Sequence, residues 1–486
     1  MTSKMKIVFL TSEMAPLAKT GGLADVAGAL PKYLSRLPRT EVVALMPYYR
    51  EVRKKNLKLK PVLKNWKLDW PGAEKEFSVY EFEAEGFLVW LIENHQYYER
   101  DYLYGTPEGD YPDNGERFAF FSLAALKTLA GMNFRPDLIH AHDWQSALTL
   151  AYLKHCPMEN GFFASTRSLF TIHNLAYQGL FQPEILKTTG LPDYLFNPED
   201  LEFYGKVNFL KAGILYSDAI STVSPTYSRE IQTPEFGFGL DGVLRKRSDR
   251  LFGILNGIDY QEWNPETDPA LPAHYSLHNQ TGKTVCRMEL LRAFNFPSDS
   301  TWPILGLVSR LAGQKGFDLL VNSLEDIMER ELFLIILGTG EKEIQNLLLE
   351  ASRKHPDRLG LKIAFDDRLA RLIYAGSDFF LIPSRYEPCG LTQMYSLRYG
   401  TIPVVRSTGG LKDSVREFDP GQLKGNGFLF ESYETKSLLQ ALDRALGFYQ
   451  KPPYWFNLIE NAMKSDFSWE KSASEYLNLY QKILNF

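Results

Sequence analysis

Short apolar runs alternate with longer amphipathic segments along the whole chain. The apolar runs have the length and residue types of buried β-strands, and the segments between them have helical periodicity. In the first half of the chain the runs lie at residues 7–10, 42–46, 138–142, 169–173 and 219–223, and the helical segments lie at 23–37, 115–130 and 145–153. This alternation predicts parallel sheets joined by right-handed crossovers. Residues 77–92 alternate apolar and polar positions more strictly, which indicates an antiparallel excursion.

The pattern is interrupted near residue 255. There Asn256-Gly257 is a turn signal, and a loop rich in Pro and Asp follows. A second series then begins, with strands predicted at residues 303–310, 332–337, 362–365, 378–382 and 402–405. We therefore expect two α/β domains, each a doubly wound, Rossmann-like fold, at residues 1–254 and 255–467. The segment 468–486 has helical periodicity and could pack on either domain. If this segment packs on the first domain, the first domain comprises residues 1–254 and 468–486.

Composition narrows the class of protein. The 486 residues are 44% hydrophobic and 23% charged, which is ordinary for a globular protein of two domains. The net charge of −5 gives no reason to expect nucleic acid or an anionic membrane as partner. No apolar run reaches the roughly 18 residues of a membrane span, and the N-terminus lacks the sections of a signal peptide. Three widely spaced cysteines (Cys156, Cys286 and Cys389) suggest reduced thiols in the cytoplasm.

The loop after the first strand carries a fixed cation. Its sequence is Lys19-Thr20-Gly21-Gly22-Leu23-Ala24-Asp25, between a strand and a predicted helix. A helix start and a lysine ammonium both favour an anion, and glycines allow close approach of a ligand or a positive φ. Seen in isolation, the run is more typical of a turn with a solvated lysine.

Histidines follow two other strands of the first domain. His140, His142 and Asp143 end one strand, and His173 ends the next. The spacing differs from that of metallohydrolases, so a metal site is disfavoured. Packed core histidines are the ordinary alternative for both positions. As site residues, Asp143 and His173 would meet Lys19 at the carboxyl edge of one parallel sheet.

The second domain has its own charged loops after strands. Arg310 and Lys315 stand five residues apart after the first strand, where they could neutralise a leaving diphosphate without a metal. Glu387 lies in a Pro- and Gly-containing turn just before a predicted helix at Leu391. Backbone N–H groups there could take a phosphate. Cys389 could be a thiol nucleophile, but a packed Cys is favoured because no His is near it in sequence.

Together these runs resemble the bacterial and plant glycogen and starch synthases, which are retaining glycosyltransferases. The resemblance covers essentially the whole chain, through the Lys19 run, His173-Asn174, Asn256-Gly257-Ile258-Asp259, Arg310 to Gly316, Glu387 to Leu391, and Ser407-Thr408-Gly409-Gly410-Leu411. It implies the GT-B fold, in which two doubly wound Rossmann-like domains face each other across a deep cleft. It also implies transfer of glucose from ADP-glucose to the non-reducing end of an α-1,4-glucan, with retention of configuration and release of ADP.

The resemblance assigns roles to individual residues. Those implied in catalysis are His173, Arg310, Lys315, Glu387 and Asp143. Those implied in substrate binding are Lys19, Gly22, Asp25, Asn256, Phe365, Gly390, Leu391 and Thr392. Arg310 and Lys315 would hold the diphosphate, Glu387 the donor glucose, and Phe365 would stack on the base. The partners implied are ADP-glucose or ADP and a glycogen or malto-oligosaccharide acceptor, with no cofactor and no metal. Tyr395 stands where many broader relatives have a second Glu, which fits the synthase branch.

Three other functions remain open at this point. A UDP-glucose-using or small-acceptor retaining glucosyltransferase would have the same fold. An α-glucan phosphorylase would need pyridoxal phosphate on a lysine. A catalytically idle carbohydrate-binding or regulatory protein would release no ADP from the donor.

Overall fold

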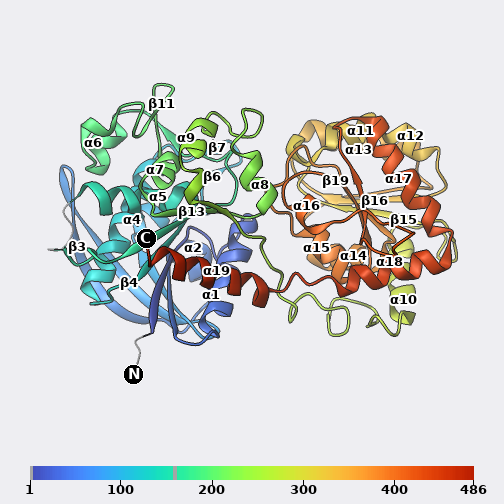
Figure 1. Cartoon of the computed structure of the whole chain (residues 1–486), viewed down its shortest axis with the longest axis horizontal. Helices are drawn as coiled ribbons and strands as arrows, with labels where there is room; N and C mark the ends of the chain where they lie inside the picture. Colours follow the sequence, from blue (N-terminus) through green and yellow to red (C-terminus); the bar gives the residue numbers. More distant parts are fainter. Residues whose placement is uncertain (1–3, 157–160) are drawn as a thin grey trace. The chain divides into compact units, whose positions relative to one another are not determined.

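The computed structural model describes residues 4–156 and 161–486, which form two compact units (Figure 1). Unit 1 comprises the chain up to Val223, Ser228–Ile254 and Trp469–Phe486. Unit 2 comprises Ser224–Tyr227 and Leu255–Ser468. Helix α8 (Pro225–Glu230) is shared between them.

Unit 1 is built on a mixed sheet with the strand order β14-β13-β9-β8-β1-β2-β5-β4-β3. All neighbours from β14 to β5 pair in parallel, whereas β5, β4 and β3 pair antiparallel. The strands are β1 (Met5–Leu10), β2 (Thr40–Pro47), β3 (Lys60–Trp70), β4 (Ala73–Glu83), β5 (Leu88–Glu93), β8 (Leu138–His142), β9 (Arg167–Ile172), β13 (Ala219–Thr222) and β14 (Leu251–Gly253). The predicted parallel strands and the antiparallel excursion are confirmed. The additional strand β3 was not predicted.

Helices cover this sheet in two groups. Helix α1 (Gly22–Ser35) packs with the C-terminal helix α19 (Trp469–Ile483), which also contacts β9. Helices α4 (Asn114–Gly131), α5 (Asp143–His155) and α7 (Phe209–Tyr216) form the other group. The shorter helices of unit 1 are α2 (Arg50–Arg53), α3 (His95–Tyr98), α6 (Ile185–Thr189) and α9 (Asp241–Lys246). Minor strands are β6 (Gly105–Thr106), β7 (Gly109–Asp110), β10 (Leu180–Phe181), β11 (Glu202–Phe203) and β12 (Lys206–Asn208).

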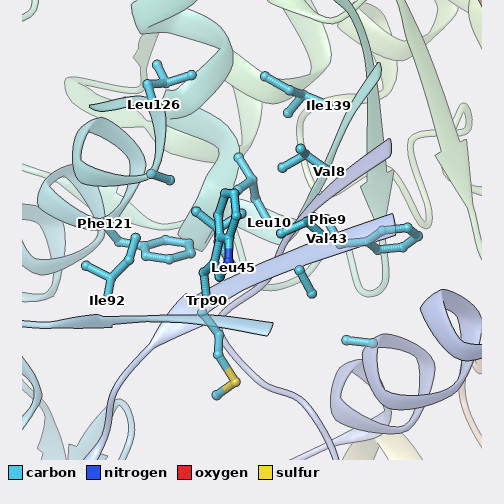
Figure 2. Packing of buried hydrophobic residues seen from close by; sticks show 14 of the residues in the cluster. Val8, Phe9, Leu10, Val43, Leu45, Trp90, Ile92, Phe121, Leu126 and Ile139 are labelled. Carbon is cyan, nitrogen blue, oxygen red and sulfur yellow. The ribbon is translucent and has the colours of Figure 1, made fainter. Parts of the chain in front are cut away.

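The core of unit 1 explains why the central strands are continuously apolar. Side chains of β1 and β2 are buried between the two helix groups, so neither face of these strands meets water. Figure 2 shows Val8 and Leu10 of β1 packed among residues of β2, β5, α4 and β8, namely Val43, Leu45, Trp90, Ile92, Phe121, Leu126 and Ile139, whereas the ring of Phe9 points to the other face of the sheet. In α19 the buried side chains recur with helical spacing, at Trp469, Tyr476, Tyr480 and Ile483.

Unit 2 contains a parallel sheet with the order β17-β16-β15-β18-β19-β20. The strands are β15 (Ile304–Val308), β16 (Phe333–Gly338), β17 (Leu359–Ile363), β18 (Phe379–Ile382), β19 (Ile402–Arg406) and β20 (Phe428–Phe430). The helices are α10 (Thr281–Ala293), α11 (Phe317–Asn322), α12 (Leu324–Met328), α13 (Lys342–Lys354), α14 (Asp367–Gly376), α15 (Thr392–Arg398), α16 (Gly409–Ser414), α17 (Thr435–Tyr449) and α18 (Pro452–Lys464). The predicted strand at 362–365 is partly wrong, because β17 begins and ends earlier.

The two sheets share one topology. Numbered by sequence, the strands of unit 2 follow the order 3-2-1-4-5-6 of the doubly wound fold, and the parallel strands of unit 1 follow the same order with one strand added. The order reverses between β1 and β8 in unit 1 and between β15 and β18 in unit 2. Ligands of such sheets bind at the carboxyl ends of the strands on either side of this switch point. The loops at this place carry the predicted site residues Lys19 and Asp143 in unit 1 and Arg310, Lys315 and Glu387 in unit 2.

Among residues 4–156 and 161–486, no helix combines the length and apolar character that crossing a bilayer requires.

Candidate active site

The switch point of unit 2 contains a cavity of about 180 Å³. Its walls come from the ends of β15 and β18, the loops that follow them, and the start of α15. The lining includes four of the predicted site residues, Arg310, Lys315, Glu387 and Thr392. The loop after β15 packs closely on the loop after β18. Gly316 lies against the carbonyl of Pro383, where a Cβ would be only 1.9 Å from the oxygen, and its φ of 78° also favours glycine.

Lys315 and Glu387 form a mostly buried ion pair at this cavity. The Lys315 ammonium donates to both carboxylate oxygens of Glu387, at 2.9 and 2.7 Å, and Ser384 Oγ donates to Oε2 at 2.9 Å. The exposed fractions of the side chains are 21% for Lys315 and 8% for Glu387. The pair therefore holds a negative and a positive group in fixed positions on one wall.

Arg310 is the contrasting member of the same cavity. It follows β15 and is exposed, and within the described ranges its guanidinium has no hydrogen-bond or ion-pair partner. A planar group with five donors and no partner is free to bind an anion in a bidentate manner.

The turn that carries Glu387 is supported by a second glycine loop. Gly410 N donates to the Glu387 carbonyl at 3.1 Å, and Gly409 and Gly410 lie so close to residues 387–389 that a Cβ at either position would collide with backbone. Gly390 has φ 70°, and Leu391 and Thr392 begin α15 directly after it. The repeated Thr-Gly-Gly run is thus a packing element in unit 2.

Cys389 is a packed residue and not an activated thiol. It is buried beside Asn256, and burial raises its pKa to about 12, so the thiol stays protonated at neutral pH. Asn256 is also buried and lies apart from the lining of the cavity. Phe365 lies beyond the end of β17 and is 89% exposed, so its ring is open to a stacking partner.

In unit 1 the Lys19 loop is organised by a residue that the sequence pattern did not single out. The carboxylate of Glu13 accepts hydrogen bonds from Thr20 N at 2.5 Å, Thr20 Oγ1 at 2.6 Å and Tyr104 Oη at 2.6 Å. Glu13 follows β1 almost directly and is buried. Its place just past the end of a strand was the signal that could have identified it.

Lys19 and Asp25 are brought together by this loop. The Lys19 ammonium lies 2.6 Å from Asp25 Oδ1, with exposed fractions of 49% and 26%. Burial raises the pKa of Asp25, although the Lys19 charge opposes the shift. Helix α1 begins at Gly22, and Gly21 has an extended φ of −153°. The expectation that this glycine pair provides a positive φ is therefore wrong, and a Cβ at either position would meet nothing within 4 Å.

A second cavity, of about 360 Å³, lies beside the Lys19 loop within unit 1. Its lining is rich in hydroxyl and carboxylate groups, which suit a polyhydroxylated ligand. It is lined by Lys19, Thr20, Glu51, Asp101, Tyr102, Leu103, Tyr104, Gly105, Thr106 and Asp110.

Asp143 and His173 are joined at the ends of β8 and β9. Asp143 Oδ1 accepts a hydrogen bond from the His173 backbone N–H at 2.7 Å. The aspartate has a φ of 54°, a left-handed conformation at the sharp turn from β8 into α5. Burial raises the pKa of Asp143 to about 7 and lowers the pKa of His173 to about 3. The imidazole is therefore neutral near pH 7, and the aspartate is poised between its two forms.

The His and Asp side chains at the ends of β8 and β9 are not arranged as metal ligands. In the described ranges, no group of three or more His, Cys, Asp or Glu side chains is arranged to hold an ion. His142 Nδ1 instead lies 3.0 Å from His173 Nε2, so these nitrogens are hydrogen-bonded to each other.

Comparisons with known proteins give the family of the chain. Residues 6–246 match the family model described as the starch synthase catalytic domain, and residues 292–462 match that of glycosyl transferases group 1. A protein named glycogen synthase from Syntrophotalea carbinolica is 46% identical over 98% of this chain and 99% of its own length. Another protein of that name, from Thermotoga maritima, is 44% identical over 99% of each chain.

Solved structures give the same result for the fold. The catalytic domain of Starch Synthase IV from Arabidopsis thaliana, bound to ADP and acarbose, has a TM-score of 0.91 and 34% identity over 100% of both chains. Sucrose-phosphate synthase from Thermosynechococcus elongatus has a TM-score of 0.61 at 17% identity, covering 99% of this chain and 100% of its own, which shows the fold alone. The prediction of a two-domain α/β GT-B fold is confirmed.

Proposed function

The chain belongs to the glycogen and starch synthase family of glycosyltransferases, and we propose that it transfers glucose from ADP-glucose to the non-reducing 4-OH of an α-1,4-glucan. The proposed donor is supported by the ADP in the related plant enzyme. The single observation that carries the proposal is the unit 2 cavity, where Arg310, Lys315 and Glu387 meet at the switch point of the sheet.

The cations of this cavity suit a leaving diphosphate. Arg310 has an unpartnered guanidinium among the described residues, which gives planar bidentate recognition of phosphate oxygens. Lys315 has three donors, and the Glu387 carboxylate oxygens occupy at most two of them. One N–H therefore remains for a phosphate while the ion pair stays intact. Because this positive charge is already in position, it stabilises the diphosphate as negative charge develops on it.

The remaining donor contacts follow from the same loops. Glu387 retains lone pairs beyond those used by Lys315 and Ser384, and these would accept from sugar hydroxyls. The N–H groups at Gly390, Leu391 and Thr392 would meet the distal phosphate. The open ring of Phe365 would stack on adenine.

Unit 1 would supply the acceptor side and the glucosyl pocket. Lys19, which pairs with Asp25, lines the 360 Å³ cavity, whose hydroxyl and carboxylate groups suit a glucan, and Gly22 would contact the substrate from the same loop. Asp143 and His173 would line the glucosyl pocket near the anomeric carbon. Asn256 would act from unit 2, through its contact with Cys389.

The proposed reaction retains the anomeric configuration. The bond from the anomeric carbon to the diphosphate oxygen breaks with its electron pair on the phosphate, leaving an oxocarbenium-like centre. The acceptor 4-oxygen attacks the same face, and its proton passes to the departing phosphate. This front-face route needs no covalent nucleophile, which fits the protonated state of Cys389. We expect no metal and no cofactor, and we place the enzyme in the cytoplasm, where Cys156, Cys286 and Cys389 remain as free thiols.

The experiment is donor-dependent incorporation of labelled glucose into glycogen, run with ADP-glucose, with UDP-glucose, and with EDTA added. We expect rapid incorporation from ADP-glucose, slower incorporation from UDP-glucose and no effect of EDTA. Equal or faster use of UDP-glucose would overturn the donor assignment. Inhibition by EDTA that added metal reverses would overturn the metal-free route, and absence of incorporation from either donor would overturn the function.

A further inference from the structure

His142 is a fully buried histidine that the proposed reaction does not use. Its ring is stacked on Phe9, with centroids 5.4 Å apart and planes 17° apart, and packs on His140 at 4.0 Å between centroids. Its backbone N–H donates to Ser146 Oγ at 2.7 Å. These contacts hold the imidazole in one orientation, with Nδ1 directed at His173.

The hydrogen between the two histidines can belong to either nitrogen. His142 Nδ1 and His173 Nε2 lie 3.0 Å apart, so one must donate and the other accept. Both rings are neutral near pH 7, because burial lowers the pKa of each. Each neutral ring carries one N–H, so the direction of this hydrogen bond fixes the tautomer of both residues.

The surroundings of His142 Nε2 decide which histidine donates in this hydrogen bond. This atom is buried and has no hydrogen-bond partner in the part of the chain that the structure describes. The neighbouring His140 cannot serve, because its two nitrogens are engaged by Tyr480 Oη at 2.8 Å and Thr171 Oγ1 at 2.5 Å. If His173 were the donor, His142 would carry its hydrogen on Nε2, as a buried N–H without an acceptor. Such orphaned donors are rare because their desolvation is not compensated.

We infer that His142 donates from Nδ1–H to His173 Nε2 and so fixes His173 as the Nδ1–H tautomer. His173 is half-buried, and its Nδ1 has no hydrogen-bond partner among the described residues. Its main chain is held separately by Asp143. The ring therefore presents one N–H donor of defined direction to a ligand. On the proposed function, this donor meets an oxygen of the bound glucosyl group, and His142 is a positioning residue that keeps His173 from turning an acceptor towards the sugar.

The tautomer is measured by long-range proton–nitrogen correlation spectroscopy on the full-length protein with ¹⁵N-labelled histidine at pH 7.5. A His173→Gln variant identifies the His173 signals. We expect His173 with a protonated Nδ1 and a bare Nε2, and His142 with a protonated Nδ1. A His173 ring protonated on Nε2 would overturn the inference. The spectrum requires no turnover, so this result is independent of whether the chain uses ADP-glucose.

Two variants separate the hydrogen bond from packing. Asparagine at position 142 has an amide nitrogen the same number of bonds from Cβ as Nδ1, so His142→Asn keeps a donor for His173. His142→Phe keeps the ring but has no donor. We expect H142F to lose the single tautomer of His173 and to lower kcat by about 10–100-fold, because a catalytic group that is no longer held in its orientation can cost up to about 10²-fold in rate, whereas KM changes little. H142N should keep both the tautomer and most of the rate.

A surface control tests whether ring substitution alone matters. His278 is exposed in unit 2, and His278→Phe should leave the spectrum of His173 and the rate unchanged. Equal losses in H142F and H142N, with the His173 tautomer intact in both, would show a role in packing only and would overturn the assignment. If H142F does not fold, the wild-type spectrum and H142N still decide the question.

Discussion

Replacing Lys315 with methionine removes one charge from the unit 2 cavity and leaves its partner buried. The ammonium lies 2.7 and 2.9 Å from the two oxygens of Glu387, whose side chain is only 8% exposed. Without Lys315, the carboxylate keeps a hydrogen bond from Ser384 at 2.9 Å and little else. The variant therefore has two separate effects, one on folding and one on transfer.

The magnitude of the first effect follows from burial. Breaking a fully buried ion pair by removing one partner costs about 3–5 kcal/mol. Lys315 is 21% exposed and Ser384 stays in place, so we expect a lower cost, about 2–3 kcal/mol. For a domain of this size, each kcal/mol shifts the melting temperature by roughly 2–4 °C. The second effect is loss of a charge that stabilises the leaving diphosphate, worth about 10²–10³-fold in kcat.

The double variant Lys315→Met, Glu387→Gln separates these effects. It leaves no buried carboxylate without its cation, so its melting temperature should return close to that of the wild type. Its kcat should stay low, because the cation is still missing. The assays are calorimetry for stability and initial rates of glucose incorporation from ADP-glucose for turnover.

A surface ion pair of the same residue types provides the control. Lys354 and Glu350 lie 3.4 Å apart on α13, with exposed fractions of 57% and 66%. Lys354→Met should change stability by at most about 0.5 kcal/mol and leave kcat unchanged. A Lys315→Met enzyme with full kcat, or a double variant that recovers it, would refute the role of Lys315 at the leaving group.

Three further predictions address the other site residues. Arg310→Ala should lower kcat about 10²-fold with the melting temperature unchanged, because the guanidinium has no partner among the described residues; a fall in stability equal to that of Lys315→Met would contradict this. Phe365→Ala should raise KM for ADP-glucose roughly 5–150-fold, the equivalent of about 1–3 kcal/mol of lost base stacking, and leave kcat unchanged; an unchanged KM in steady-state kinetics would remove Phe365 from the donor site. Asp143 has a folded-state pKa raised to about 7, so the folded protein favours its protonated form. Its contribution to the free energy of unfolding is therefore full below about pH 4 and is lost as the pH rises towards 7. The loss is about 1.4 kcal/mol for each pH unit in that window. Asp143→Asn should therefore gain stability relative to the wild type as the pH rises from about 5 to 8 in thermal melts, and a difference that does not change with pH would contradict the raised pKa.

The sequence was sufficient for the fold because apolar runs and helical periodicity are local signals. Strands β1, β8 and β13 lie within a residue or two of the predicted runs, since both faces of a central parallel strand are buried and the run is continuous. The pattern missed β3, in which exposed polar positions outnumber buried ones. It also placed Phe365 in a strand, although β17 ends before it.

The site was predictable only in part, because its contacts join residues far apart in the chain. Strand order brings Lys315 and Glu387 together, and periodicity alone does not give their pairing. Glu13 was missed for the same reason, since its bonds to Thr20 and Tyr104 depend on how the loops fold back. The pairing of His142 with His173 requires that β8 and β9 be neighbours in register.

The most direct test of the proposed reaction is a proton NMR time course with ADP-glucose and a short malto-oligosaccharide. We expect one new α-1,4 anomeric signal for each ADP released. A β-linked product, free glucose in place of a longer chain, or release of ADP without a new linkage would contradict the proposed transfer.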